Sequence, residues 1–265
     1  GSSVDWGGDP NGNYGDMLNF PYTGGPGACC GFYNPSQDLA NAYKTDANGL
    51  PLLDNFYTGL WVSNPAGSPY TGTLDPRIDW VMGREGIPYL DWGNHPGAAW
   101  IRNPVNDGLF SPKKNVYAAS QKGQYTDVGS AYWGPTELVA NNVNIIRFSD
   151  VILWRAECEY SSDLTAAMND VNRVRNRVAD HPETWVKSGS DYNAATATYG
   201  SAGEDADNYA IKPYTSATFT SANALKAIQM ERRLELAMEG QRFFDLVRWG
   251  IAATTINAYI GREKA

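Results

Sequence analysis

Apolar positions recur with a helical period only in the second half of the chain. Between residues 163 and 179 they form one stripe, which predicts an amphipathic helix. The preceding stretch, 145–160, is apolar on nearly all sides and predicts a buried helix, paired with the first as a helical hairpin. Ser221 is a suitable N-cap for a third helix, whose apolar face includes Ile228 and Leu234. The stripe of the amphipathic helix consists of Leu164, Ala167, Met168, Val171, Val174 and Val178.

Turn-forming residues dominate the first half of the chain. Gly, Pro, Asn, Asp and Ser recur every few positions, and we predict a short helix only over 36–43. Residues 181–220 are again rich in turn-forming residues. We therefore divide the chain into a loop-rich, aromatic-rich region, residues 1–143, and a helical region, residues 144–265, which carries a loop insertion at 181–220. Long loops in a compact protein usually carry function, so the ligand site is expected in the first region.

Glutamates repeat every four residues along the third predicted helix. Glu231, Glu235 and Glu239 lie on one side of it, where like charges repel unless cations neutralise them. Arginines close in sequence are the expected partners, both on the same stretch (Arg232, Arg233 and Arg242) and upstream between residues 173 and 177. The pattern predicts packed helices tied by carboxylate–guanidinium bonds, and such networks are more often structural than catalytic.

The same stretch carries a family resemblance. The run from Glu231 to Gly250, ERRLELAMEGQRFFDLVRWG, resembles the SusD/RagB family of Bacteroidetes outer-membrane lipoproteins. A second matching block runs from Asn144 to Glu157 and is followed by the pattern Asn172-x-x-Arg175-x-Arg177. A weaker third block is Leu74-Asp75-Pro76-Arg77-Ile78. The resemblance therefore covers about residues 73–262, whereas the first 70 residues match the family only in character.

The resemblance implies a mainly α fold, in which a TPR-like helical superhelix forms the scaffold and a large loop-rich subdomain binds the ligand, although no 34-residue repeat is legible here. Family members begin with a lipoprotein signal and are longer, so we expect this chain to be a C-terminal portion without the lipid anchor. The positions that match the family motifs, and that the resemblance assigns to the scaffold, are Arg147, Glu157, Asn172, Arg175, Arg177, Glu231, Arg232, Glu235, Glu239, Arg242, Asp245 and Arg248.

Composition narrows the classes of partner. The formal net charge is −8 and no run of basic residues is present, which argues against nucleic acid. No stretch reaches the ~18 apolar residues that a membrane-spanning helix needs. Aromatic residues make up 12% of the chain, with 9 Trp and 16 Tyr, although the mean hydropathy is −0.44. Aromatic side chains in polar surroundings suit sugars or peptides, and packing between loops is the alternative explanation.

Candidate ligand-binding residues cluster before the second block. The C–H face of a pyranose ring stacks on Trp or Tyr, while its hydroxyls need amide or charged partners. Residues 88–96 combine two aromatic residues, an acid and an amide on a turn-rich loop, and form the best single segment. The candidate set is Trp61, Tyr70, Tyr89, Asp91, Trp92, Asn94, Trp100 and Arg102.

The resemblance implies a non-catalytic protein at the extracellular face of the outer membrane. It would bind an oligosaccharide or a starch-like polysaccharide and deliver it to a SusC-like TonB-dependent transporter. One alternative is a RagB-like protein that binds peptides. A second is a glycoside hydrolase, which needs two carboxylates flanking the scissile bond, but no such pair has a recognisable signature here. The loop aspartates that could supply the pair are Asp75, Asp79, Asp91 and Asp107.

The cysteines and the acidic loop residues give little evidence for a disulfide framework or for a metal site. Three cysteines make no disulfide framework. A bond between the neighbours Cys29 and Cys30 requires a strained ring, so we expect them to be free or bridged elsewhere. Cys158 lies in an apolar helix and is expected to be a small buried residue. We expect no cofactor; a Ca²⁺ ion has only weak support, because no 12-residue Ca²⁺ loop is present. The loop oxygens considered for it belong to Asp5, Asp9 and Asn11.

Overall fold

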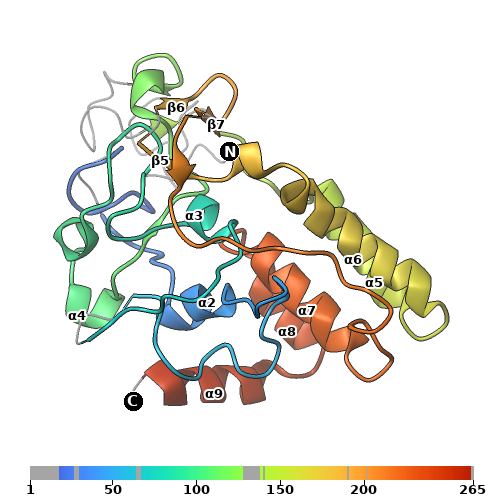
Figure 1. Ribbon diagram of the computed structural model, residues 1–265. Helices are drawn as coiled ribbons and strands as arrows, with labels where there is room; N and C mark the ends of the chain where they lie inside the picture. Colours follow the sequence, from blue (N-terminus) through green and yellow to red (C-terminus); the bar gives the residue numbers. More distant parts are fainter. Residues whose placement is uncertain are drawn as a thin grey trace. The chain divides into compact units, whose positions relative to one another are not determined.

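The computed structural model divides the chain into two compact units (Figure 1). We call them the loop unit, which comprises Gly1–Ser36, Asp79–Val143 and Val186–Ala206, and the helical unit, which comprises Gln37–Ile78, Asn144–Trp185 and Asp207–Ala265. The structure describes residues 18–26, 30–63, 67–127, 138–139, 141–189, 191–200 and 202–263. One border between these units follows Val143. Residues 37–78 group with the helices, and residues 186–206 group with the loops.

Three helices that pack on one another form the core of the helical unit. They are α5 (Phe148–Glu159), α6 (Leu164–Ala179) and α7 (Ala224–Glu235). Helix α6 confirms the predicted amphipathic helix: Asp163 caps its N-terminus by accepting a hydrogen bond from the Ala166 amide. The buried residues at the centre of this core are Leu50, Ile152, Leu153, Ala156, Ala167, Val171, Val174, Tyr214, Phe219, Ala224, Ala227 and Ile228.

Helix α5 is not the buried helix that its composition predicts. Of its residues only Asp150, Ile152, Leu153 and Ala156 are buried. The side chain of Phe148 is 64% exposed, and Cys158 is exposed as well, so both expectations of burial are wrong. The reason is that α6 and α7 cover one side of α5 in this structure, whereas an apolar composition on all sides does not reveal which sides are covered.

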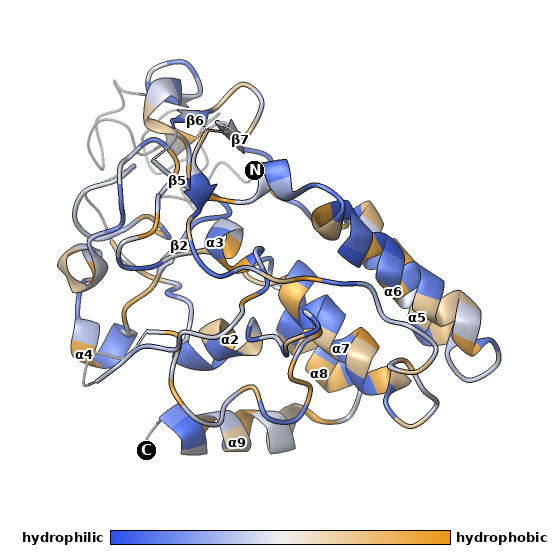
Figure 2. Cartoon of the chain, viewed as in Figure 1, coloured by the Kyte–Doolittle hydropathy of each residue, from blue (hydrophilic) through white to orange (hydrophobic). Residues whose placement is uncertain are grey.

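The other helices of this unit are short or follow α7. The third predicted helix begins at Ala224 rather than after Ser221. The reason is the turn before it, which Asn223 holds. Its side chain accepts a hydrogen bond from the Thr220 amide and donates one to the Thr218 carbonyl. Hydrophobic residues recur along α5, α7 and α8 (Figure 2). The remaining helices of the unit are α2 (Gln37–Ala42), which confirms the predicted short helix, η3 (Pro182–Thr184), α8 (Gln241–Arg248) and α9 (Ala252–Glu263).

Glu231 and Glu235 of the predicted row are buried and paired, and their partners include Arg175 and Arg177 from the upstream segment that the sequence suggested. Glu231 accepts hydrogen bonds from Arg77 and Arg175. Glu235 pairs with Arg77, Arg147 and Arg177. Burial alone would raise the pKa of Glu235, but these guanidinium groups outweigh it and lower the pKa to about 2.

The arginines nearest in sequence bind other carboxylates. Arg232 joins Asp150 of α5 to Asp245 of α8, with nitrogen–oxygen distances of 2.7 and 2.8 Å. Arg233 pairs with Asp38. Arg242 differs from these arginines because its guanidinium lies over the Trp249 ring. Its Nη1 has no hydrogen-bond partner among the described residues, and burial lowers its pKa to about 10.

The remaining motif positions also make structural contacts in this unit. Arg147 pairs with Glu239 as well as Glu235. Asn172 exchanges two hydrogen bonds with the backbone of Tyr214. Glu157 accepts from Arg248 of α8 and from the indole of Trp249, so it ties α5 to the end of α8.

The loop unit is built from short elements, as the sequence predicts. Its helices are α4 (Pro104–Asp107), the single turns η1 (Gly97–Trp100) and η2 (Ala119–Gln121), and most of α3 (Ile78–Val81). Each strand has two residues, and the strands pair antiparallel in twos. The pairs are β1 (Met82–Gly83) with β2 (Ser111–Pro112), β3 (Thr126–Asp127) with β4 (Leu138–Val139), β5 (Lys187–Ser188) with β8 (Glu204–Asp205), and β6 (Tyr192–Asn193) with β7 (Thr198–Tyr199).

A buried lysine stands at the centre of this unit. The Lys113 ammonium donates to the carbonyl oxygens of Asp79 and Pro88 and lies within 6 Å of three aromatic ring centroids, among them those of Trp80 and Tyr199. Burial lowers the pKa of Lys113 to about 7, although the nearby Asp79 carboxylate acts in the opposite direction. The aromatic core of the unit consists of Phe20, Tyr89, Leu90, Val116, Tyr117, Ala118 and Val139.

The buried network gives a stability prediction. In a Glu231→Ala variant, Arg77 and Arg175 would stay buried with one carboxylate fewer, so the free energy of unfolding should fall by about 3–5 kcal/mol. Urea denaturation followed by circular dichroism would measure it. Lys226→Ala is the matched control, because the Lys226–Asp54 ion pair is exposed and its loss should cost less than about 1 kcal/mol. Equal losses for the two variants would contradict the structural role of the network.

Candidate functional site

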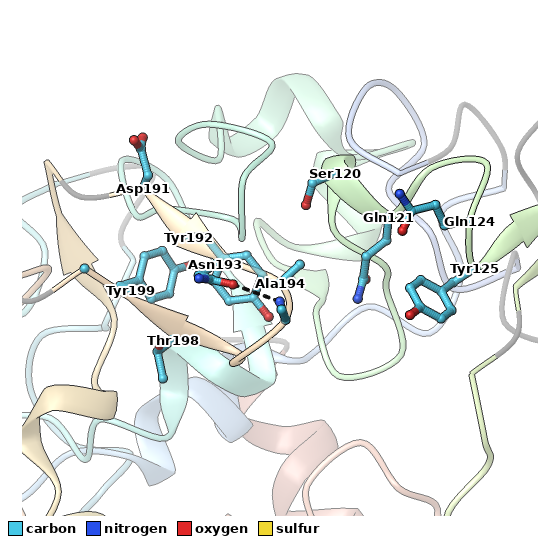
Figure 3. A pocket seen from close by; sticks show the side chains of 12 residues that line it. Ser120, Gln121, Gln124, Tyr125, Asp191, Tyr192, Asn193, Ala194, Thr198 and Tyr199 are labelled. Carbon is cyan, nitrogen blue, oxygen red and sulfur yellow. Dashed lines mark hydrogen bonds between the residues drawn. The ribbon is translucent and has the colours of Figure 1, made fainter.

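A pocket of about 820 Å³ lies within the loop unit (Figure 3). One wall is formed by the turn η2 and the residues that follow it, and the other by the β6–β7 hairpin. Amides, hydroxyls and tyrosines line it, and Asp191 is the one carboxylate among its described lining residues. Those residues are Ser120, Gln121, Gln124, Tyr125, Asp191, Tyr192, Asn193, Ala194, Ala195, Thr198, Tyr199 and Gly200.

The hairpin wall is anchored by one buried tyrosine. Tyr199 packs against Trp80 and Tyr192, and its hydroxyl accepts a hydrogen bond from the Leu90 amide and donates to the Pro88 carbonyl. At the turn, Asn193 Oδ1 accepts from the Ala195 amide at 2.9 Å. These bonds fix the hairpin while Asp191 and Asn193 remain exposed at the pocket.

The opposite wall is held by Asp91. Its carboxylate accepts hydrogen bonds from the amides of Ala119 and Ser120, at 2.5 and 2.8 Å, and so satisfies the start of η2. Gln121 Oε1 accepts from the Ala118 amide, which closes the same turn. Asp91 therefore positions Gln124 and Tyr125 at the pocket without lining it.

The predicted ligand residues Trp92, Tyr89 and Trp100 take packing positions. The Trp92 indole donates to the Tyr117 carbonyl at 2.8 Å. Tyr89 has an exposed fraction of 0%, donates to the Pro112 carbonyl and meets the Trp100 ring edge to face. Tyr89 therefore offers no surface to a ligand in this structure.

Of the other four predicted ligand residues, two are exposed and two are half-buried. Asn94 is exposed and forms a backbone bridge with Pro88. Arg102 is exposed on another part of the loop unit. Trp61 and Tyr70 belong to the helical unit, where the Trp61 carbonyl accepts a hydrogen bond from the Tyr70 amide. None of the eight predicted residues is among the described residues that line the pocket.

The pocket residues were missed because of where they lie in the sequence. Residues 191–200 fall in the segment that we assigned to the helical region as a loop insertion. Strands of two residues show no alternation that a sequence pattern can reveal. The usable signal was the spacing of Tyr192 and Tyr199 on either side of a polar turn.

The loop aspartates proposed for a hydrolase are occupied by structural contacts. Asp75 binds Arg77 in the helical unit. In the loop unit, Asp79 binds Arg84 through two hydrogen bonds, and Asp107 accepts one from the Asn103 amide. Together with Asp91 at η2, these carboxylates serve the fold.

No cluster of three or more His, Cys, Asp or Glu side chains that could hold a metal ion occurs among the described residues. Asp5, Asp9 and Asn11, named above for Ca²⁺, lie outside the described residues. No described helix is long and apolar enough to span a membrane. Cys30 is disulfide-bonded, which excludes the expectation that it is free, whereas Cys158 is a free thiol.

The chain belongs to the SusD family, whose model matches residues 2–265. The match includes the first 70 residues, which the sequence motifs left unassigned. Proteins of this family bind ligands without catalysing a reaction. No curated protein matches the chain.

Solved structures of SusD proteins resemble this chain. A SusD superfamily protein from Bacteroides vulgatus is 17% identical, with a TM-score of 0.50 over 87% of this chain and 37% of its own. A SusD homologue from Bacteroides thetaiotaomicron is 23% identical, with a TM-score of 0.41 over 69% of this chain and 31% of its own. A SusD-like carbohydrate-binding protein from Bacteroides fragilis is 22% identical, with a TM-score of 0.47 over 83% of this chain and 36% of its own.

The first of these likenesses shows a mostly helical SusD-like fold. The chain spans little more than a third of the length of that protein, at 37%.

The buried His95 of the loop unit gives a prediction for pH. Burial, helped by the Lys113 charge, lowers the pKa of His95 to about 3. In the unfolded chain His95 takes up a proton near pH 6.5, so its stabilising effect is complete above that pH and is lost as the pH falls toward 3.

The free energy of unfolding should therefore fall with a slope approaching about 1.4 kcal/mol per pH unit from this residue alone. Urea titrations between pH 7 and 4 would compare wild type with His95→Gln, which should lack this part of the slope. His181→Gln, at an exposed histidine, is the control. Equal slopes in wild type and His95→Gln would contradict the buried, neutral state of His95.

Proposed function

We propose that this chain captures an oligosaccharide, without cleaving it, in the pocket between η2 and the β6–β7 hairpin. The observation that carries the proposal is the lining of that pocket: amides, hydroxyls and tyrosine rings with a single carboxylate among the described residues. Membership of a family of binding proteins supports the same reading.

The chemistry of the lining suits a sugar. The Tyr125 ring is 54% exposed and provides a flat face for the C–H side of a pyranose. The amides of Gln124 and Asn193 supply donors and acceptors for hydroxyl groups. Asp191 adds a charged acceptor, but a hydrolase that cleaves glycosides needs a second carboxylate opposite it.

Family membership extends the proposal to the cell surface. We expect the full protein to be a lipoprotein on the outer face of the outer membrane. It would pass its ligand to a SusC-like TonB-dependent transporter. In the same proposal, helices α5 to α7 form part of a TPR-like superhelix. Peptide binding remains the alternative that the ligand test below would detect.

The pocket assignment predicts which variants lose binding. Native affinity electrophoresis against plant, host and microbial polysaccharides should show retardation by at least one glycan. Tyr125→Ala or Gln124→Ala should weaken that binding by roughly 2- to 12-fold, since an aromatic contact contributes about 0.5–1.5 kcal/mol beyond burial and a hydrogen bond a similar amount.

The control is Tyr57→Ala, which removes an exposed tyrosine of the helical unit and should leave binding unchanged. Released reducing ends would be assayed in the same samples, and their appearance would contradict the non-catalytic proposal. Retardation that survives both pocket variants would place the site elsewhere. Binding of peptides but of no glycan would favour the alternative.

A further inference from the structure

A second surface of the loop unit combines an arginine with two exposed aromatic rings. The Arg102 guanidinium carbon lies 5.6 Å from the ring centroid of Tyr22 and 5.1 Å from that of Phe32. The two side chains are 43% and 51% exposed, and Arg102 is exposed as well. We call these three residues the arginine platform. It shares no residue with the described lining of the pocket.

The backbone holds this platform in place. The Tyr22 amide donates to the Trp100 carbonyl, and the Phe32 amide donates to the Leu18 carbonyl. Gly31 fits between the side chains: a Cβ added there would lie 2.8 Å from Tyr22 Cβ and 3.3 Å from Arg102 Cβ, and its φ of +64° favours glycine. The three segments are thus fixed before any ligand arrives, which lowers the entropic cost of binding.

The hydrogen-bonding capacity of Arg102 is largely unused within the described part of the chain. Within that part, Arg102 Nη1 donates a hydrogen bond to the Cys30 carbonyl oxygen, at a long distance of 3.3 Å. Arg232, which lies over the Trp154 ring in the helical unit, shows that a stacked arginine of this chain can pair with a carboxylate, because it binds Asp150. A guanidinium presents five N–H donors in a fork that matches a carboxylate.

We propose that the arginine platform binds an acidic sugar, namely a hexuronate unit of an oligosaccharide. The carboxylate pairs with Arg102, and the C–H face of the pyranose packs on the ring of Phe32 or Tyr22. This inference rests on the proposed function and names the class of glycan that the chain prefers.

The local cation, and not the net charge of the protein, favours an acidic sugar. The protein carries a net charge of −8, so long-range electrostatics repel an anionic glycan and any preference for one must come from a local cation. The hydroxyls of a neutral sugar can also accept hydrogen bonds from the guanidinium, but only a carboxylate forms two parallel charge-assisted bonds with its fork. The aromatic faces in turn distinguish a sugar acid from a small inorganic anion.

Isothermal titration calorimetry with tri-galacturonate, and with the same trisaccharide as its methyl ester, tests the proposal. The ester keeps the sugar rings and removes the charge. Wild type should bind the acid at least about tenfold more tightly than the ester, because a hydrogen bond to a charged group contributes about 1.5–3 kcal/mol. Arg102→Gln should abolish that difference, and Arg102→Lys, which keeps the charge but loses the fork, should reduce it.

The matched control is Arg173→Gln. Arg173 is also an exposed arginine over an aromatic ring, 5.1 Å from that of Phe148, but it belongs to the helical unit. It should keep the full preference for the acid. Circular dichroism melting curves identify any variant that has lost its fold, and Arg102→Lys then carries the comparison.

Three outcomes would overturn the proposal. They are equal affinity for acid and ester, a preference unchanged in both Arg102 variants, and tighter binding of a sulfated galactan trisaccharide than of the galacturonate. In each of these cases the proposed function of the pocket still holds if a neutral glycan binds the wild type and binds Tyr125→Ala more weakly. If no glycan of any kind binds, both fail together.

Discussion

The helical unit depends on a row of glutamates that cannot be buried alone. Glu231 and Glu235 are almost inaccessible to solvent, and removing a carboxylate from water costs several kcal/mol unless partners replace the lost hydration. Arg77, Arg175 and Arg147 supply those partners from three different parts of the chain. Any packing of α7 that leaves one of them out would strand a buried charge. The network therefore favours one arrangement of these segments over the others, even if its net contribution to stability is small.

The sequence identified the charges of this network and part of their pairing, since Arg175 and Arg177 of the upstream segment do bind the row. Glu231, Glu235 and Glu239 were correctly interpreted as structural, since a regular row of like charges needs cations. Proximity in sequence suggested Arg232 and Arg233 as partners, but residues that follow one another on a helix point in different directions. Arg232 therefore reaches Asp150 and Asp245, and Arg233 reaches Asp38. The fork of arginine allows two carboxylates to share one cation, which no spacing rule reveals.

The fold and the candidate site were likewise predictable only in part. Helix α6 was predictable because its apolar stripe faces one core. The burial of α5 was not, since composition does not show which side has neighbours. Aromatic residues in the segment 88–96 were taken for a ligand surface, yet Tyr89 is part of the core. Burial of an aromatic side chain is a tertiary property, and in a region without regular secondary structure no periodicity indicates it.

The segment 88–96 nevertheless organises the pocket from behind. The Pro88 carbonyl accepts hydrogen bonds from both Lys113 and Tyr199, so the buried ammonium and the hairpin wall share one acceptor. Asp91 fixes the opposite wall through two backbone amides. In a unit with strands of only two residues, side-chain bonds to the backbone replace the ladders that would otherwise hold the loops. Asp91 and the Pro88 carbonyl hold the two walls without belonging to the described lining of the pocket.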